Sequence, residues 1–118
     1  MATVKHTING NEYEFINSTR RNRSGFVHET ALYKNGEFIG EHKVQYYNRT
    51  WESYQYQTVM KGAIRILQDA EFETFKNSWK NQHNVKRLTE SKKVEMMQEF
   101  TDRKPALYAD LQELYMEL

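Results

Sequence analysis

The side chains in this sequence best suited to proton or metal chemistry are its histidines. The four of them are His6, His28, His42 and His83. They lack the HExxH spacing that sets two imidazoles on one helical face to bind a metal ion. A two-residue turn at Asn35-Gly36 would place Glu29 opposite His42, as an acid–base pair requires. A structural cross-strand pair is the simpler interpretation, because no nucleophile or orienting group accompanies it.

Other reactive groups and catalytic motifs are missing from the sequence. The chain has no cysteine, which excludes thiol nucleophiles, disulfides and thiolate metal sites. It contains no P-loop, GxGxxG or GxSxG motif. We therefore expect no catalytic residue, no metal site and no cofactor, in a protein that is not an enzyme.

A cluster of arginines falls in the segment 17–25, which is rich in turn-forming residues. We expect this segment to be a loop that connects two strands. Guanidinium groups bind phosphate through paired hydrogen bonds, so the loop is a candidate nucleic-acid contact. The net charge of +1 argues against a dedicated nucleic-acid-binding protein, because such proteins need several converging cations. The candidate residues are Arg20, Arg21, Arg23 and, after the last expected strand, Arg49.

Acidic residues concentrate near the end of the sequence, where residues 95–118 contain six acidic residues against two basic ones. Helical spacing places them in two stripes, each opposite the apolar face of its helix. A stripe of carboxylates can imitate the phosphates of nucleic acid toward a basic partner. An ordinary solvated helix face is the alternative interpretation. The two stripes are Glu95, Glu99 and Asp102, and Asp110, Glu113 and Glu117.

Five aromatic residues lie between positions 46 and 56. Trp51 and Tyr56 are expected to be core residues. The other three are Tyr46, Tyr47 and Tyr54, which are candidate contact residues because tyrosine buries a large area at a small entropic cost.

The elements that must position these residues begin with two hairpins, at Asn9-Gly10 and Asn35-Gly36. The first turn pairs Lys5 with Glu14 on one face and Val4 with Phe15 on the other. The second pairs Lys34 with Glu37, Leu32 with Ile39 and Val27 with Val44. Four antiparallel strands are expected, at 2–8, 12–17, 25–34 and 37–47, in one meander.

After the strands the apolar period changes from two to about 3.6. Thr50 is expected to cap a helix with Glu52 in its first turn. Its apolar stripe runs from Tyr56 to Ala70, and the stripe of Phe72, Phe75 and Trp79 is out of phase with it. We therefore expect a bend or break at 68–71.

Two further helices are expected near the end of the chain. Thr89 is a candidate cap for the first of them, with Val94, Met96, Met97 and Phe100 as its apolar stripe. Pro105 fits the first turn of the second. A regular leucine stripe from Leu107 to Leu118 is expected to dock on the sheet, with a dimer seam as the alternative.

The sequence predicts one α+β domain over residues 1–118, with a β-meander at 1–48 and a helical part at 50–118. No apolar run reaches the length of a membrane span or of a signal-peptide core, so a cytoplasmic protein without membrane contact is expected.

The segment 46–59, YYNRTWESYQYQTV, resembles segments of small accessory proteins of bacteriophages and prophages of Gram-positive bacteria. The resemblance implies a protein made in the host cytoplasm during infection, of a size typical of phage inhibitors that block a host enzyme or a defence nuclease, including anti-CRISPR proteins. It carries no functional residues over to this chain.

Three functional hypotheses follow. The first is a binding protein that inhibits a host protein, such as a nuclease with a basic channel, through the acidic stripes and the neighbouring tyrosines. The second is a nucleic-acid-binding module that lays its sheet on DNA and contacts phosphates through the arginines. The third is a structural protein that self-associates through its C-terminal helix.

Overall fold

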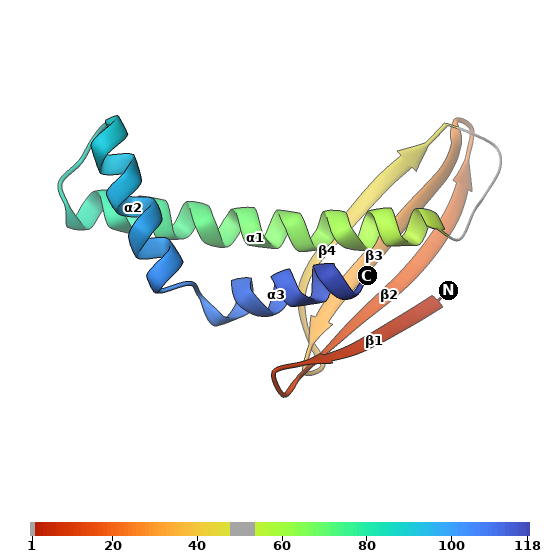
Figure 1. The fold of residues 1–118 in the computed structure, drawn as a ribbon. Helices are drawn as coiled ribbons and strands as arrows, with labels where there is room; N and C mark the ends of the chain where they lie inside the picture. Colours follow the sequence, from red (N-terminus) through yellow and green to blue (C-terminus); the bar gives the residue numbers. More distant parts are fainter. Residues whose placement is uncertain (1, 48–53) are drawn as a thin grey trace.

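The chain folds into a four-stranded antiparallel sheet followed by three helices, and this confirms the expected α+β class (Figure 1). The structure is a computed structural model and describes residues 2–47 and 54–118. The sheet has the strand order β1-β2-β3-β4 of a meander. The elements are β1 (Ala2–Ile8), β2 (Asn11–Asn22), β3 (Gly25–Lys34), β4 (Glu37–Tyr46), α1 (Tyr54–Gln82), α2 (Glu90–Asp102) and α3 (Ala106–Glu117).

The first hairpin has the register that its Asn-Gly turn predicts. Asn9 and Gly10 both adopt positive φ, at 50° and 81°, as a two-residue turn matched to the strand twist requires. Lys5 lies opposite Glu14, with its Nζ 3.6 Å from Glu14 Oε2. Alternate residues of the two strands therefore face the core, and the charged residues face away from it.

The second hairpin follows the predicted register only next to its turn. Tyr33 pairs with Phe38, but Leu32 pairs with Gly40, so Ile39 has no partner and forms a bulge. Beyond the bulge every predicted pair is wrong by one residue. Among the corrected pairs are Val27 with Gln45, Glu29 with Lys43, Thr30 with His42 and His28 with Val44.

The close approach of α1 to β4 explains why the bulge is useful at this point. A Cβ atom added to Gly40 would lie 3.0 Å from Leu67 Cδ2, so any larger residue would require the Leu67 side chain to shift by a few tenths of an ångström. The bulge brings Gly40 under Leu67 while Ile39 still packs against the core. Glu29 instead forms an ion pair with Lys43, at 3.6 Å. The predicted Glu29–His42 pair is therefore wrong.

The segment expected to be a long arginine-rich loop is mostly strand. β2 continues to Asn22, and only Arg23 and Ser24 separate it from β3. Its turn-forming residues are compatible with a strand because their side chains find partners under α1. Thr19 Oγ1 lies 2.8 Å from His28 Nδ1, and Asn17 Nδ2 donates to Met60 Sδ at 3.5 Å.

α1 is one continuous helix of 29 residues, so the expected break at 68–71 is wrong. The two apolar stripes are out of phase because they meet different partners. Met60 and Ile64 pack in the core over the sheet, whereas Phe72 and Phe75 contact Phe100 of α2. The C-terminal half of α1, together with α2, therefore forms an arm that projects beyond the sheet (Figure 1). The expected cap and first-turn acid, Thr50 and Glu52, lie outside the described residues.

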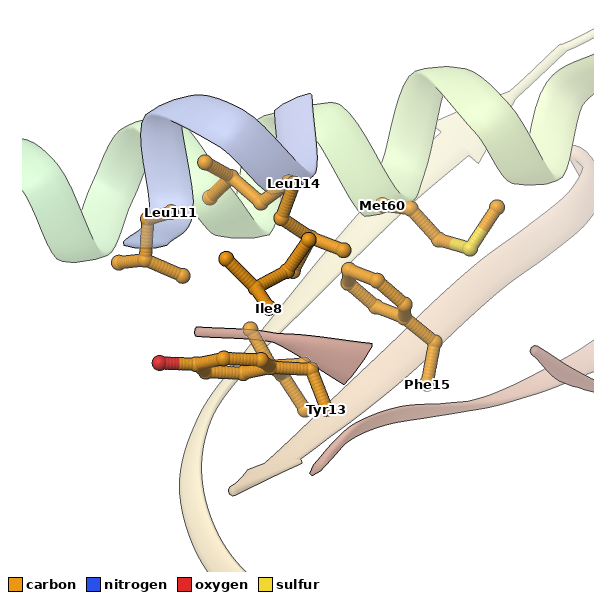
Figure 2. Packing of buried hydrophobic residues seen from close by; sticks show 8 residues of the cluster. Ile8, Tyr13, Phe15, Met60, Leu111 and Leu114 are labelled. Atoms are coloured by element: carbon orange, nitrogen blue, oxygen red, sulfur yellow. The ribbon is translucent and has the colours of Figure 1, made fainter. Parts of the chain in front are cut away.

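α2 and α3 begin near the expected positions. Thr89 caps α2 by accepting a hydrogen bond from the backbone N–H of Lys92. Pro105 occupies the N-cap position of α3 and offers no side-chain cap. Leu111 and Leu114 of α3 are fully buried against Ile8, Tyr13 and Phe15 of the sheet, which confirms that the leucine stripe docks there (Figure 2). The stripe is therefore not available as a dimer seam.

Within 2–47 and 54–118, no helix combines the length and the apolar character that crossing a membrane would require.

Candidate functional site: the exposed face of helix α2

Asp110, predicted to be exposed on α3, is a buried residue at the centre of a hydrogen-bond cluster. Only 4% of its surface is accessible. Tyr13 Oη donates to Asp110 Oδ2 at 2.7 Å, and Asn11 Nδ2 donates to the same oxygen at 2.9 Å. Asn9 Nδ2 donates to Oδ1 at 2.8 Å. Asp110 therefore fastens the first hairpin to α3.

These contacts set the ionisation of the cluster. Burial by itself would raise the pKa of Asp110, but the hydrogen bonds from Asn9, Tyr13 and Asn11 outweigh it and hold this pKa below its ordinary value of 3.8. Burial raises the pKa of the Tyr13 hydroxyl, and the hydrogen bond to the Asp110 carboxylate raises it further. At neutral pH the pair is thus a neutral phenol that donates to a carboxylate.

The other two acids of α3 also contact the first hairpin. Glu117 Oε2 lies 2.9 Å from His6 Nδ1, and Glu113 Oε2 accepts a longer hydrogen bond, at 3.4 Å, from Asn9 Nδ2. The predicted acidic stripe on α3 is therefore wrong for Asp110, which is buried, whereas Glu113 and Glu117 are exposed. The acids of α3 lie toward β1 and its turn, because the leucines and the acids both pack against the same hairpin.

The acids of α2 remain at the surface. Glu95 and Asp102 are exposed and Glu99 is half-buried, while Met96 and Phe100 form the buried side of the helix. Lys92 Nζ lies 3.4 Å from Glu95 Oε2, and Gln98 Nε2 donates to Asp102 Oδ1 at 3.3 Å. The acidic stripe predicted for α2 is thus present on the helical arm.

The position of these acids within α2 is unfavourable for the helix itself. Glu99 and Asp102 lie in the last turn, which contains no basic residue. The C-terminal end of a helix carries partial negative charge, so each carboxylate there costs roughly 0.3 to 1 kcal/mol. Helix stability therefore does not account for this placement.

An exposed apolar pair lies on the same helix, on the other flank of its exposed side. Val94 is 66% exposed and Met97 is 41% exposed. With 3.6 residues per turn, the exposed side of α2 passes from Met97 and Val94 across Gln98 to Asp102 and Glu95. A shallow hollow of about 400 Å³ follows the apolar flank, lined by Glu90, Lys93, Val94, Met97, Gln98 and Thr101.

A separate apolar groove of about 470 Å³ lies between α1 and the start of α3, with Leu67, Phe75 and Leu107 in its wall. Glu71 is also in the wall, and the backbone N–H of Tyr108 acts to lower its pKa. Gln68 Nε2 donates to the backbone oxygen of the same residue at 3.3 Å. Burial raises the pKa of Glu71 above its ordinary value of 4.5.

The three candidate tyrosines have different surroundings. Tyr46 is half-buried and its ring centroid lies 4.9 Å from that of His28. Tyr47 is 76% exposed. Tyr54 begins α1, but its side chain and the whole of Trp51 lie outside the described residues. The expected core residue Tyr56 packs against the core, and its Oη lies 2.7 Å from Thr19 Oγ1.

The arginines do not form one basic face. Arg20 pairs with Val27 and Arg21 with Phe26, so the two side chains leave β2 on opposite faces of the sheet. Arg23 lies in the turn, and Arg49 lies outside the described residues. The sheet therefore does not present Arg20 and Arg21 together to a duplex lying on one of its faces.

Sequence reasoning does not identify the exposed pair on α2. It places Val94, Met96, Met97 and Phe100 in one apolar stripe, although only Met96 and Phe100 are buried. Their spacing contains the signal, because residues three apart at 94 and 97 share a flank that differs from the flank of 96 and 100. In the described part of the chain, no group of three or more His, Asp or Glu residues is arranged to hold a metal ion.

Comparison with known protein families, with curated proteins and with solved structures finds no match to this chain.

Proposed function

We propose that this protein is a non-enzymatic binding protein that inhibits a host protein by occupying a basic nucleic-acid-binding surface with the exposed side of α2. The observation that carries the proposal is the placement of Glu99 and Asp102 in the last turn of α2, where they oppose the helix dipole. Acids kept at a cost to their own helix are typical of residues selected for binding.

The neighbouring apolar flank supports a protein as the partner. Val94 and Met97 are large exposed side chains that lie beside the acids on one continuous surface. Methionine is enriched in protein interfaces and adapts its shape to the partner. A partner with cationic side chains around an apolar patch would match both flanks.

The arm geometry supports inhibition by occupation. α2 lies at the end of the molecule farthest from the β2–β3 turn, and it is connected to the sheet through the continuous helix α1 (Figure 1). A helix held at the end of an arm can enter a channel that is too narrow for the whole domain. The resemblance of residues 46–59 to phage accessory proteins is the reason for proposing a host defence nuclease, such as a CRISPR effector, as the partner, and the host cytoplasm as the location.

The proposal is tested by capture and competition. The parent protein and the variant Glu95→Lys/Asp102→Lys are immobilised, and host proteins that bind the parent alone are identified. The matched control is Asp69→Lys/Glu73→Lys, which reverses the charge at two exposed acidic positions of α1. We expect to capture a host protein that still binds the control variant but does not bind the α2 variant. Saturating this host protein with the parent protein should abolish its binding to nucleic acid.

Two results would contradict the proposal. One is a captured partner that binds nucleic acid equally well in the presence of the protein. The other is complete inhibition of the partner at a small fraction of its concentration, because a protein without chemistry of its own inhibits with a fixed stoichiometry.

A further inference from the structure

β4 is an edge strand of the sheet, and among the described strands it pairs with β3 alone. Every second residue of an edge strand directs its N–H and C=O groups away from the sheet, where they can pair with another strand. β4 is ten residues long, whereas β1, at the other edge, has seven. The bulge at Ile39 lies near the start of β4, so the segment 40–46 pairs with β3 in regular register. β4 therefore offers the longer edge for an added strand.

The charges of β4 lie on the open face of the sheet. Gly40 and His42 lie under α1, so alternation places Glu41 and Lys43 on the opposite face. Glu41 is exposed, and within residues 2–47 and 54–118 it forms no ion pair. Lys43 lies 3.6 Å from Glu29, and half of its side chain remains exposed. The edge thus presents one acid and one base, two residues apart, on the same face.

This spacing makes the strand complementary to a second copy of itself. Two β4 strands that pair antiparallel about a two-fold axis present the same residues to each other. With the axis at His42, Glu41 of each copy lies opposite Lys43 of the other, and Gly40 lies opposite Val44. An axis at Glu41 or at Lys43 would place like charges opposite each other, which destabilises a cross-strand pair. Charges on an edge strand commonly prevent pairing, but those of β4 match in one register.

The other edge strand lacks this property. β1 contains Lys5 and His6 but no acidic residue, so two copies of β1 could form no cross-strand ion pair. His6 also lies 2.9 Å from Glu117 of α3. The complementary charges therefore favour β4 over β1 as the edge that pairs.

An exposed apolar residue of α1 lies above the β4 edge, where α1 crosses β4 and continues beyond the sheet (Figure 1). Gly62 and Leu67 both contact β4: a Cβ atom on Gly62 would lie 2.5 Å from His42 Cδ2, and one on Gly40 would lie 3.0 Å from Leu67. With about 100° per residue, Ile66 lies between Gly62 and Leu67 around the helix axis, so it also points toward β4. Ile66 is nevertheless 47% exposed. A strand added beside β4 would extend the sheet beneath Ile66 and bury it.

We infer that the protein forms a two-fold symmetric dimer in which the β4 strands of two copies pair antiparallel about His42 and join the two sheets into one. Glu41 of each copy forms an ion pair with Lys43 of the other on the open face. Ile66 of each copy covers the added strand on the helix face. The inference does not rest on the inhibitor function, because it concerns β4 and the first half of α1 rather than α2.

Charge reversal at the two positions tests the pairing by sedimentation velocity. Glu41→Lys sets like charges opposite each other at both sites of the dimer, and Lys43→Glu does the same. Each variant alone should therefore dimerise about tenfold more weakly than the parent. An equimolar mixture of the two variants restores opposite charges at both sites and should form a heterodimer about as tight as the parent dimer. Glu12→Lys, at an exposed position on the same face of β2, is the matched control and should dimerise as the parent does.

Two further measurements follow the helix face and the backbone. Ile66→Ala should weaken the dimer about tenfold, because both copies lose buried apolar surface. Val94→Ala, which shortens an exposed apolar side chain of α2, should have no effect on the dimer. Amide exchange in the segment 40–44 should slow as the protein concentration rises, and exchange in β1 should not.

Thermal unfolding of each variant, followed by circular dichroism, separates a weakened dimer from a weakened fold. The inference is overturned if the parent stays monomeric at about 0.5 mM, where even a weak dimer would be populated. It is also overturned if mixing Glu41→Lys with Lys43→Glu does not restore the dimer. Equal losses in Glu12→Lys and Glu41→Lys would overturn it as well, because the interface would then lie elsewhere on the sheet.

Discussion

The hydroxyl of Tyr13 on β2 donates a 2.7 Å hydrogen bond to the carboxylate of Asp110 on α3, and both groups are buried. The two residues are 97 positions apart in sequence. Because Asn9 and Asn11 donate to the same carboxylate, the first hairpin and the last helix share one acceptor. Removing that acceptor takes a hydrogen bond from three donors at once, of which Asn9 keeps its longer bond to Glu113.

Asp110→Ala is therefore expected to lower the free energy of unfolding by about 3 kcal/mol, since the buried hydroxyl of Tyr13 loses its charged partner and two asparagine amides lose a hydrogen bond. Asp102→Ala is the matched control, because Asp102 is exposed, and should change stability by less than about 0.5 kcal/mol. Urea denaturation followed by circular dichroism measures both. Equal effects of the two substitutions would show that the Asp110 cluster contributes nothing to stability.

The pH dependence of stability should reveal two acids, the buried Asp110 and the half-buried Glu71, whose pKa values shift in opposite directions on folding. The pKa of Asp110 is lowered on folding, so its stabilisation is present above its ordinary value of 3.8 and is lost as the pH falls through the folded value. The difference between the parent and Asp110→Asn should therefore shrink on acidification below about pH 4.

For Glu71 the sign is reversed. Burial raises its pKa on folding, so the charged form destabilises the folded state, and this cost disappears as the pH falls toward the ordinary value of 4.5. Glu71→Gln keeps an acceptor for the backbone N–H of Tyr108 and removes the charge. We expect this variant to be more stable than the parent at neutral pH and equal to it near pH 4. A variant less stable than the parent at neutral pH would contradict this assignment.

The features that the sequence predicts correctly are those set by neighbouring residues. The Asn9-Gly10 turn fixes the register of its hairpin through local backbone geometry, and all of its predicted pairs are confirmed. The bulge at Ile39 lies beside Gly40, which packs under Leu67 from a distant part of the sequence, and no local pattern marks it. The continuity of α1 likewise depends on α2, because Phe72 and Phe75 are out of phase with the core stripe and pack instead on Phe100.

In the candidate site, too, features set by local spacing are predicted and features set by distant residues are not. The acids of α2 are predicted correctly as an exposed stripe, because the apolar period of one helix decides which flank is free. The burial of Asp110 on α3 is not predicted, because helical spacing cannot reveal that Asn9, Asn11 and Tyr13 approach it from a hairpin some hundred residues earlier.

The aromatic contacts of the arm lead to a further prediction. Phe100 is 4% exposed, and its ring centroid lies between 5.0 and 5.2 Å from those of Phe72, Phe75 and Tyr108. Phe100→Ala should lower the free energy of unfolding by about 3 to 4 kcal/mol. Amide exchange should accelerate most in α2, which makes few other contacts, and less in the strands. Val94→Ala, at an exposed position of the same helix, should leave both measurements close to those of the parent.

The acids at the end of α2 have opposing effects: they lower the stability of the helix, and their proposed role is to bind a basic partner. Asp102→Lys replaces a carboxylate with a cation in the turn where the helix dipole favours cations, and it should raise the free energy of unfolding by roughly 0.5 kcal/mol.

If α2 binds a basic partner, Asp102→Lys should weaken that binding although it stabilises the protein, and the salt dependence of binding should become less steep. Asp69→Lys, at an exposed position of α1, should bind as the parent does. Unfolding curves and a salt-titrated binding series with the captured partner measure the two effects separately. A variant that is both more stable and equally tight in binding would remove the reason for assigning the acids of α2 to an interface.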